Sequence, residues 1–206
     1  MHVWGLTGGI ACGKSTVLEL LRREGAAVRS ADDDAREAFD EPPVRAALAR
    51  LFPDAVGPDG LDRAAIAAAV FADPERRKAL EAVVHPAVRR RMRQAIAAAR
   101  ANDSKGLLVY EVPLLYEGGL ESWFDGVVVV AASMPTRLAR LAQRARRTGA
   151  PDDGSARIAA QMPLEAKIGR ADRVVTNDGE MVQLEREVAR IVDEWRAAGF
   201  RCVPGD

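Results

Sequence analysis

The sequence predicts an α/β fold in which helices pack against a buried, five-stranded parallel β-sheet. The first observation is a set of short, continuous apolar runs at 107–111, 126–131 and 173–177, a pattern typical of strands buried on both faces. The second is that helical patterns at about 134–147, 153–162 and 180–198 alternate with these runs. The third is a glycine-rich loop placed between the first apolar run and the first helical pattern.

The first thirty residues supply a strand, a helix and a second strand. Residues 2–7 form an apolar run that ends in glycines. Between residues 14 and 24 apolar side chains recur at helical spacing, and Gly25 stands where a helix commonly ends. Residues 26–30 are a weaker strand candidate.

The region from about 33 to 103 is expected to be helical. Proline and glycine signals divide it at "EPP", "FPDAVGPDG", "ADPE" and "HP". Its helices could form a subdomain inserted between the strands, although a chain of 206 residues is short for two independent domains.

The composition limits the possible partners and the compartment. Basic and acidic residues number 30 each, which argues against a nucleic-acid-binding protein. The apolar runs are too short to cross a membrane, no secretory signal opens the chain, and two cysteines make no disulfide framework. We therefore expect a cytoplasmic protein, monomeric or a small homo-oligomer.

The loop has the spacing G-x-x-x-x-G-K-S from Gly8 to Ser15, which predicts a phosphate-binding loop. Its backbone N–H groups and the positive end of the following helix would hold phosphates. Lys14 would reach the β- and γ-phosphates, and the Ser15 hydroxyl would help to hold Mg²⁺. The simpler alternative is a glycine turn ahead of a helix.

Such a loop does not by itself distinguish hydrolysis, switching and transfer. The chain lacks the guanine-reading N-K-x-D, because "TNDG" at 176–179 has no lysine, so a GTPase is disfavoured. A nucleotide switch without turnover and another small-molecule kinase, such as a nucleoside monophosphate kinase, remain alternatives. Asp32 follows the second strand and could orient or deprotonate an attacking hydroxyl, or it could only cap the next helix.

Taken together, "GLTGGIACGKSTV", "SADDDAR", "HP", "EVPLLYE", "QMPLEAK" and "ADRVVTN" resemble the dephospho-coenzyme A kinase family along almost the whole chain. The resemblance implies ATP-dependent phosphorylation of the ribose 3′-hydroxyl of dephospho-CoA, with Mg²⁺. It also implies a three-layer P-loop kinase core (1–30, 104–133 and 170–206), a helical CoA subdomain (about 33–103) and a helical lid (about 134–169).

The resemblance assigns roles to particular residues. Nucleotide binding falls on Gly9, Ile10, Ala11, Cys12, Gly13, Lys14, Ser15 and Thr16, and the catalytic residues are Asp32, Lys14 and Arg144. Ser30 replaces the first aspartate of the family's D-A-D segment, and Asp33 or Asp34 could compensate. Ala11-Cys12 replaces the usual Gly-Ser, so Ala11 needs a backbone conformation that tolerates a Cβ.

The acceptor side and the lid complete the expected site. The resemblance places Asp32, His85, Glu111 and Leu115 against the substrate, although Pro86 also makes His85 a candidate kink or helix boundary. Arg144 and Arg157 are favoured as phosphate contacts. Asn177 could read the adenine edge or could cap a turn. Residues 161–167 are expected to be a hinge or support segment without chemistry.

Overall fold

A parallel sheet forms the centre of the larger of two units in the computed structural model, which describes residues 1–58, 60–102, 106–148, 158–159 and 161–202. The larger unit comprises Met1–Ser30 and Ala98–Asp206, and the smaller comprises Ala31–Ala97. Among the described residues, no helix combines the length and apolar composition needed to cross a membrane.

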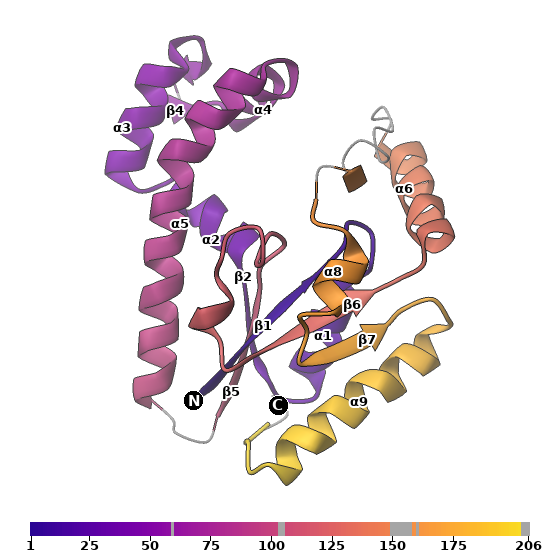
Figure 1. Cartoon of the computed structure of the whole chain (residues 1–206). Helices are drawn as coiled ribbons and strands as arrows, with labels where there is room; N and C mark the ends of the chain where they lie inside the picture. Colours follow the sequence, from indigo (N-terminus) through magenta and orange to yellow (C-terminus); the bar gives the residue numbers. More distant parts are fainter. Residues whose placement is uncertain (59, 103–105, 149–157, 160, 203–206) are drawn as a thin grey trace. The chain divides into compact units, whose positions relative to one another are not determined.

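Within the described part of the larger unit, five strands lie in the order β2-β5-β1-β6-β7, and every neighbouring pair is parallel (Figure 1). This confirms the predicted five-stranded parallel sheet. The strands are β1 (His2–Gly8), β2 (Ala27–Ser30), β5 (Leu107–Glu111), β6 (Gly126–Ala131) and β7 (Arg173–Thr176).

Helices cover both faces of the sheet. Alternate side chains of β1 point to opposite faces, so the contacts of Trp4 and Thr7 show what packs on each face. On one side Trp4 packs against Trp195 of α9 (Met181–Ala197), which in turn contacts α1 (Lys14–Arg23). On the other side Thr7 bonds to the Pro113 carbonyl, which also accepts from Lys167 of α8 (Leu164–Ile168). The core is therefore a three-layer α/β arrangement, as predicted.

Helix α6 (Met134–Thr148) also belongs to the larger unit and follows β6 after two residues. Its predicted range of 134–147 agrees with the structure. The predicted helix at 153–162 falls mostly on residues outside the described part of the chain. The sequence does not predict the short helix α8, because five residues give too little periodicity to recognise.

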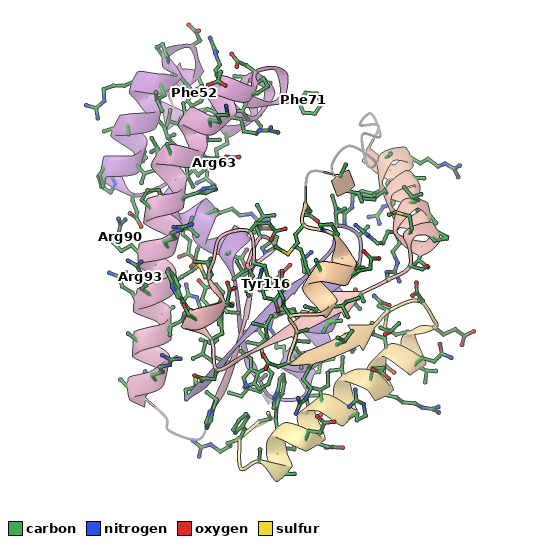
Figure 2. The ribbon with its side chains drawn as sticks, viewed as in Figure 1. Phe52, Arg63, Phe71, Arg90, Arg93 and Tyr116 are labelled. Atoms are coloured by element: carbon green, nitrogen blue, oxygen red, sulfur yellow. The ribbon has the colours of Figure 1, made fainter. Side chains whose placement is uncertain are left out.

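The smaller unit is helical, apart from one short hairpin. It contains α2 (Ala31–Ala38), α3 (Pro42–Leu51), the 3₁₀ turn η1 (Pro53–Ala55), the hairpin strands β3 (Val56–Gly57) and β4 (Gly60–Leu61), α4 (Arg63–Ala72) and most of α5 (Pro74–Asn102). Phe52 is buried in it, whereas Phe71 is largely exposed (Figure 2).

Helix α5 corrects one expectation, because it runs unbroken through His85 and Pro86. Pro86 removes the hydrogen bond that the Ala82 carbonyl would accept in a regular helix. Both Ala82 and Pro86 lie on the exposed face of α5, so this carbonyl can be hydrated. Pro86 is therefore neither the start of a helix nor a break in one.

Candidate nucleotide site

The phosphate loop runs from the end of β1 to the start of α1. The N-cap residue of α1 is Gly13, which lies in the left-handed region with φ of 89°. A Cβ there would lie 2.2 Å from Asn177 Nδ2, so glycine is needed both for conformation and for space. Since Gly13 has no side chain to cap α1 and its first turn has no acidic residue, the positive helix end is left for an anion.

Ala11 adopts a backbone conformation that favours glycine, although it carries a side chain. Its φ is +60°, in the left-handed region, and it is the one non-glycine residue with positive φ among the described residues. This conformation costs an L-residue about 1–2 kcal/mol. The loop geometry is kept at that cost.

Side chains hold the loop in place through its carbonyl groups. Every carbonyl from Gly8 to Cys12 accepts a hydrogen bond from a side chain of the same unit. The donors are Lys14 Nζ to Gly8 (3.4 Å) and Gly9 (3.2 Å), Arg137 Nε to Ile10 (3.0 Å), Arg140 Nη1 to Ala11 (3.2 Å) and Asn177 Nδ2 to Cys12 (2.9 Å).

These contacts determine where the loop amides point. In a planar trans peptide the C=O of one residue and the N–H of the next point in opposite directions. The bonds to the Ile10 and Cys12 carbonyls therefore turn the N–H groups of Ala11 and Gly13 away from the supporting side chains. The Cys12 N–H bonds to the Gly9 carbonyl at 3.3 Å. The loop is thus set to present the Ala11 and Gly13 amides to an anion.

Asn177 and Asp178, directly after β7, join the loop to α6. Asn177 is buried, and its Oδ1 accepts a hydrogen bond from Arg140 Nη2 at 3.2 Å while its Nδ2 holds Cys12. The carboxylate of Asp178 accepts from the Ser133 N–H at 2.8 Å, just ahead of α6. Hydrogen bonds from Thr136 and from the Ser133 backbone lower the pKa of Asp178. The start of α6 is therefore fixed to the same edge of the sheet as the phosphate loop.

A pocket of about 620 Å³ opens beside the loop. Its walls come from the loop and start of α1, from α6, and from the residues after β7 and the start of α9. It is lined by Ala11, Gly13, Ser15, Thr16, Arg140, Gln143, Arg144, Arg147, Asn177, Gly179, Met181 and Leu184. Loop amides and arginines at one wall and apolar Met181 and Leu184 at another suit a phosphorylated ligand with a flat apolar base.

Some of the expected nucleotide-binding residues line this pocket and others do not. Ser15 and Thr16 line the pocket with Arg144, whereas Cys12 is fully buried and both its N–H and its carbonyl are bonded within the protein. Arg157 lies outside the described residues. Arg137, which the sequence does not single out, is 5 % exposed and bonds to the loop at Ile10. Arg140 belongs to "RLAQR", which matches the R-L-x-x-R of the resembled family, but nothing in the local sequence separates Arg137 from the other arginines of α6, because its role depends on a contact with the loop.

The expected acceptor residues lie in both units. Glu111 ends β5 with Ser30 as its register partner at the end of β2, so both stand at the carboxyl edge of the sheet. Leu115 is fully buried, and a Cβ on Gly5 would lie 2.6 Å from its Cδ1. Leu115 is therefore a core residue of the larger unit with no surface open to a ligand in this structure.

In the smaller unit, the three aspartates of α2 differ in their surroundings. Asp32 and Asp33 are exposed in the first turn of α2, and Asp33 bonds to Arg36 at 2.7 Å. Asp34 is 1 % exposed, with its carboxylate 3.7 Å from Arg91 Nε of α5. Its burial and its pairing with Arg91 make Asp34 part of the packing of this unit. His85 is exposed on α5.

A family model described as dephospho-CoA kinase matches residues 2–183. A protein named dephospho-CoA kinase from Anaeromyxobacter dehalogenans is 46% identical over 207 residues, covering 99% of this chain and 97% of its own length. Among solved structures, a crystal structure of a Thermus thermophilus protein has a TM-score of 0.74 at 42% identity, covering 94% of this chain and 97% of its own. A dephospho-CoA kinase from Campylobacter jejuni shares the fold with a TM-score of 0.69 at 23% identity, covering 94% and 97%.

Proposed function

The chain belongs to the dephospho-coenzyme A kinase family, and from this premise we propose that it transfers the γ-phosphoryl group of ATP to the ribose 3′-hydroxyl of dephospho-CoA, giving coenzyme A. The observation that carries the proposal is the outward anchoring of the loop carbonyls, which turns the Ala11 and Gly13 amides toward a bound anion. A loop with this geometry is suited to holding a nucleotide's phosphates before any reaction begins.

On the donor side we assign phosphate binding to residues 9–16. Lys14 now contacts the neutral carbonyls of Gly8 and Gly9, and phosphate oxygens would offer it stronger, charge-assisted hydrogen bonds. Arg144 lines the same pocket and would contact the transferred phosphate, with Arg157 as the second such contact. The Asn177 side chain bonds to Cys12 and Arg140, so any contact that it makes with the nucleotide would be made while it holds these two residues.

The residues present also fit a magnesium ion. Mg²⁺ with a nucleotide is usually held by one or two protein oxygens together with phosphates and water. The exposed Ser15 hydroxyl at the start of α1 is such an oxygen, and among the described residues no group of three or more His, Cys, Asp or Glu forms a dedicated metal cage. The ion would neutralise phosphate charge during transfer.

On the acceptor side we assign Asp32 the role of orienting or deprotonating the 3′-hydroxyl. Asp32 is exposed and follows β2 by two residues, whereas Asp34 is buried. Glu111, at the end of β5, and His85, on α5, are proposed substrate contacts. Since phosphoryl transfer passes through a loose transition state, positioning by Asp32 is expected to matter more than its basicity.

The proposal extends to the subdomains of the enzyme, its compartment and its partners. We propose that the helical residues of about 33–103 bind the CoA moiety and that about 134–169 act as a lid that excludes water from the reaction. We further propose a cytoplasmic enzyme, monomeric or a small homo-oligomer, with no nucleic-acid or membrane partner. Cys12 and Cys202 are both buried free thiols, which suits a reducing compartment.

The test is ADP release from ATP and Mg²⁺ with dephospho-CoA, with nucleoside monophosphates, or with no acceptor. Release that depends on dephospho-CoA, with one equivalent of coenzyme A formed per ADP, is the expected result. Release that depends on a nucleoside monophosphate would assign the chain another acceptor. Nucleotide binding without any acceptor-dependent release would instead identify a switch.

A further inference from the structure

The segment 161–170, which contains α8, touches both sides of the proposed reaction. It begins at Gln161, whose side-chain Oε1 accepts a hydrogen bond from the Ile10 N–H at 3.0 Å, across 151 positions of sequence. Ile10 is part of the phosphate loop. The start of the segment is therefore attached to the donor side of the site.

The same segment is attached to the acceptor-side loop, residues 112–117 after β5. The Met162 N–H donates to Glu117 Oε1 at 3.0 Å, and Lys167 Nζ lies 2.8 Å from the same carboxylate oxygen. Lys167 also donates to the Pro113 carbonyl at 3.3 Å. The Tyr116 hydroxyl, labelled in Figure 2, donates to the Arg170 carbonyl at 2.9 Å.

Lys167 is the part of these attachments that is shielded from water. Its side chain is fully buried, so the Glu117 carboxylate and the Pro113 carbonyl take the place of water around it. Partial burial raises the pKa of Glu117, but hydrogen bonds from Lys167 and from backbone N–H groups outweigh it and hold the pKa below its usual value. The segment and the acceptor-side loop therefore form one charged, hydrogen-bonded assembly.

Gln161 is the link from this assembly to the phosphate loop. The peptide between Gly9 and Ile10 is held at both ends, since its carbonyl accepts from Lys14 and its N–H donates to Gln161. The Ile10 amide is thus occupied by a side chain, whereas the neighbouring Ala11 amide is turned to the inside of the loop. Moving the segment would tilt this peptide and displace the Lys14 contact with it.

We propose that Gln161 is a positioning residue that fixes the phosphate loop relative to the acceptor-side loop, so that phosphate is transferred to the acceptor rather than to water. The inference rests on the proposed function. Gln161 makes no contact with reacting atoms in this account. It acts through the Ile10 amide, and its loss should change the outcome of the reaction more than the affinity for nucleotide.

The test compares Gln161→Met, which keeps the length of the side chain but removes the acceptor oxygen, with Gln161→Glu, which keeps an acceptor oxygen. Glu185→Met on the exposed face of α9, outside the pocket lining, is the control of similar size. Coenzyme A formed per ADP released is measured at saturating substrates, together with nucleotide affinity and thermal stability. Saturation is needed because the added charge of Gln161→Glu will weaken ATP binding. The ratio does not depend on the fraction of folded enzyme.

For Gln161→Met we expect transfer turnover to fall about tenfold, as for one lost hydrogen bond that leaves its donor unsatisfied. ADP release without acceptor should fall much less, so the ratio of coenzyme A to ADP drops. Gln161→Glu should recover most of the ratio, and Glu185→Met should match the wild type.

Two results would overturn the inference. If Gln161→Met has an unchanged ratio of coenzyme A to ADP and differs from the wild type only in lower thermal stability, Gln161 is a purely structural residue. An unchanged ratio with weaker nucleotide binding would limit its role to the phosphate loop. Failure of the proposed function is distinct, because the wild type and Glu185→Met would then also form no coenzyme A.

Discussion

Replacing Ala11 with glycine should stabilise the protein, although the change removes a methyl group. Ala11 has φ of +60°, a conformation that costs an L-residue about 1–2 kcal/mol and glycine essentially nothing. About 0.5–1 kcal/mol of this gain is lost, because glycine makes the unfolded chain more flexible than alanine does. The remaining net gain is about 1 kcal/mol, which corresponds to a rise in Tm of about 2–4 °C for a domain of this size.

The measurement is thermal unfolding of ligand-free protein followed by circular dichroism. Ala189→Gly is the control, because Ala189 lies inside α9, where the same change should lower stability by about 1 kcal/mol. Ala11→Val should also lower it, since a branched side chain fits the left-handed region poorly. A drop in Tm for Ala11→Gly similar to that of Ala189→Gly would refute the claim that Ala11 is strained.

Three further predictions concern the supports of the site. Gly13→Ala should weaken ATP binding at least tenfold in titration calorimetry, because its Cβ would lie 2.2 Å from Asn177 Nδ2; unchanged affinity would show that the loop can shift without loss. Asn177→Asp places a carboxylate oxygen against the Cys12 carbonyl and should also weaken ATP binding, whereas Asn177→Ser should do so less; the reverse order would refute the contact. Glu117→Gln should destabilise the fold by about 3 kcal/mol in urea unfolding, and Lys167→Met by less, because Lys167 is fully buried and Glu117 is not. Folding lowers the pKa of Glu117 below the ordinary glutamate value of 4.5, so its ionised form stabilises the protein above that pH. The difference in stability between the wild type and Glu117→Gln should therefore shrink as the pH falls below 4.5. A difference that grows on acidification would show that folding does not lower the pKa of Glu117.

The sequence predicted the parallel sheet well because its strands are continuous apolar runs. The bounds of β5 and β6 agree with the predicted 107–111 and 126–131, and both strands are almost wholly buried. The hairpin of β3 and β4 and the helix α8 are too short to produce a recognisable period. In α5 an exposed position tolerates Pro86, so the local preference of proline did not end the helix.

The phosphate loop could be recognised from its own residues, but its supports could not. Gly8, Gly13 and Lys14 lie within one short motif whose spacing has a physical meaning. Asn177 offered a base contact or a turn cap, and its bond to Cys12 spans 165 positions of sequence. The sequence assigns Gln161 no chemistry for the same reason, because no local pattern indicates a partner that only the fold brings near.

The central claim is that Asp32 orients the acceptor hydroxyl while the phosphate loop holds the donor independently. Single-turnover transfer to dephospho-CoA, measured together with ATP affinity in Asp32→Asn and in the adjacent Asp33→Asn, tests it most directly. We expect Asp32→Asn to lose most of the transfer rate at unchanged ATP affinity and Asp33→Asn to stay close to the wild type. Full transfer in Asp32→Asn, or its loss in Asp33→Asn instead, would show that Asp32 does not orient the acceptor hydroxyl.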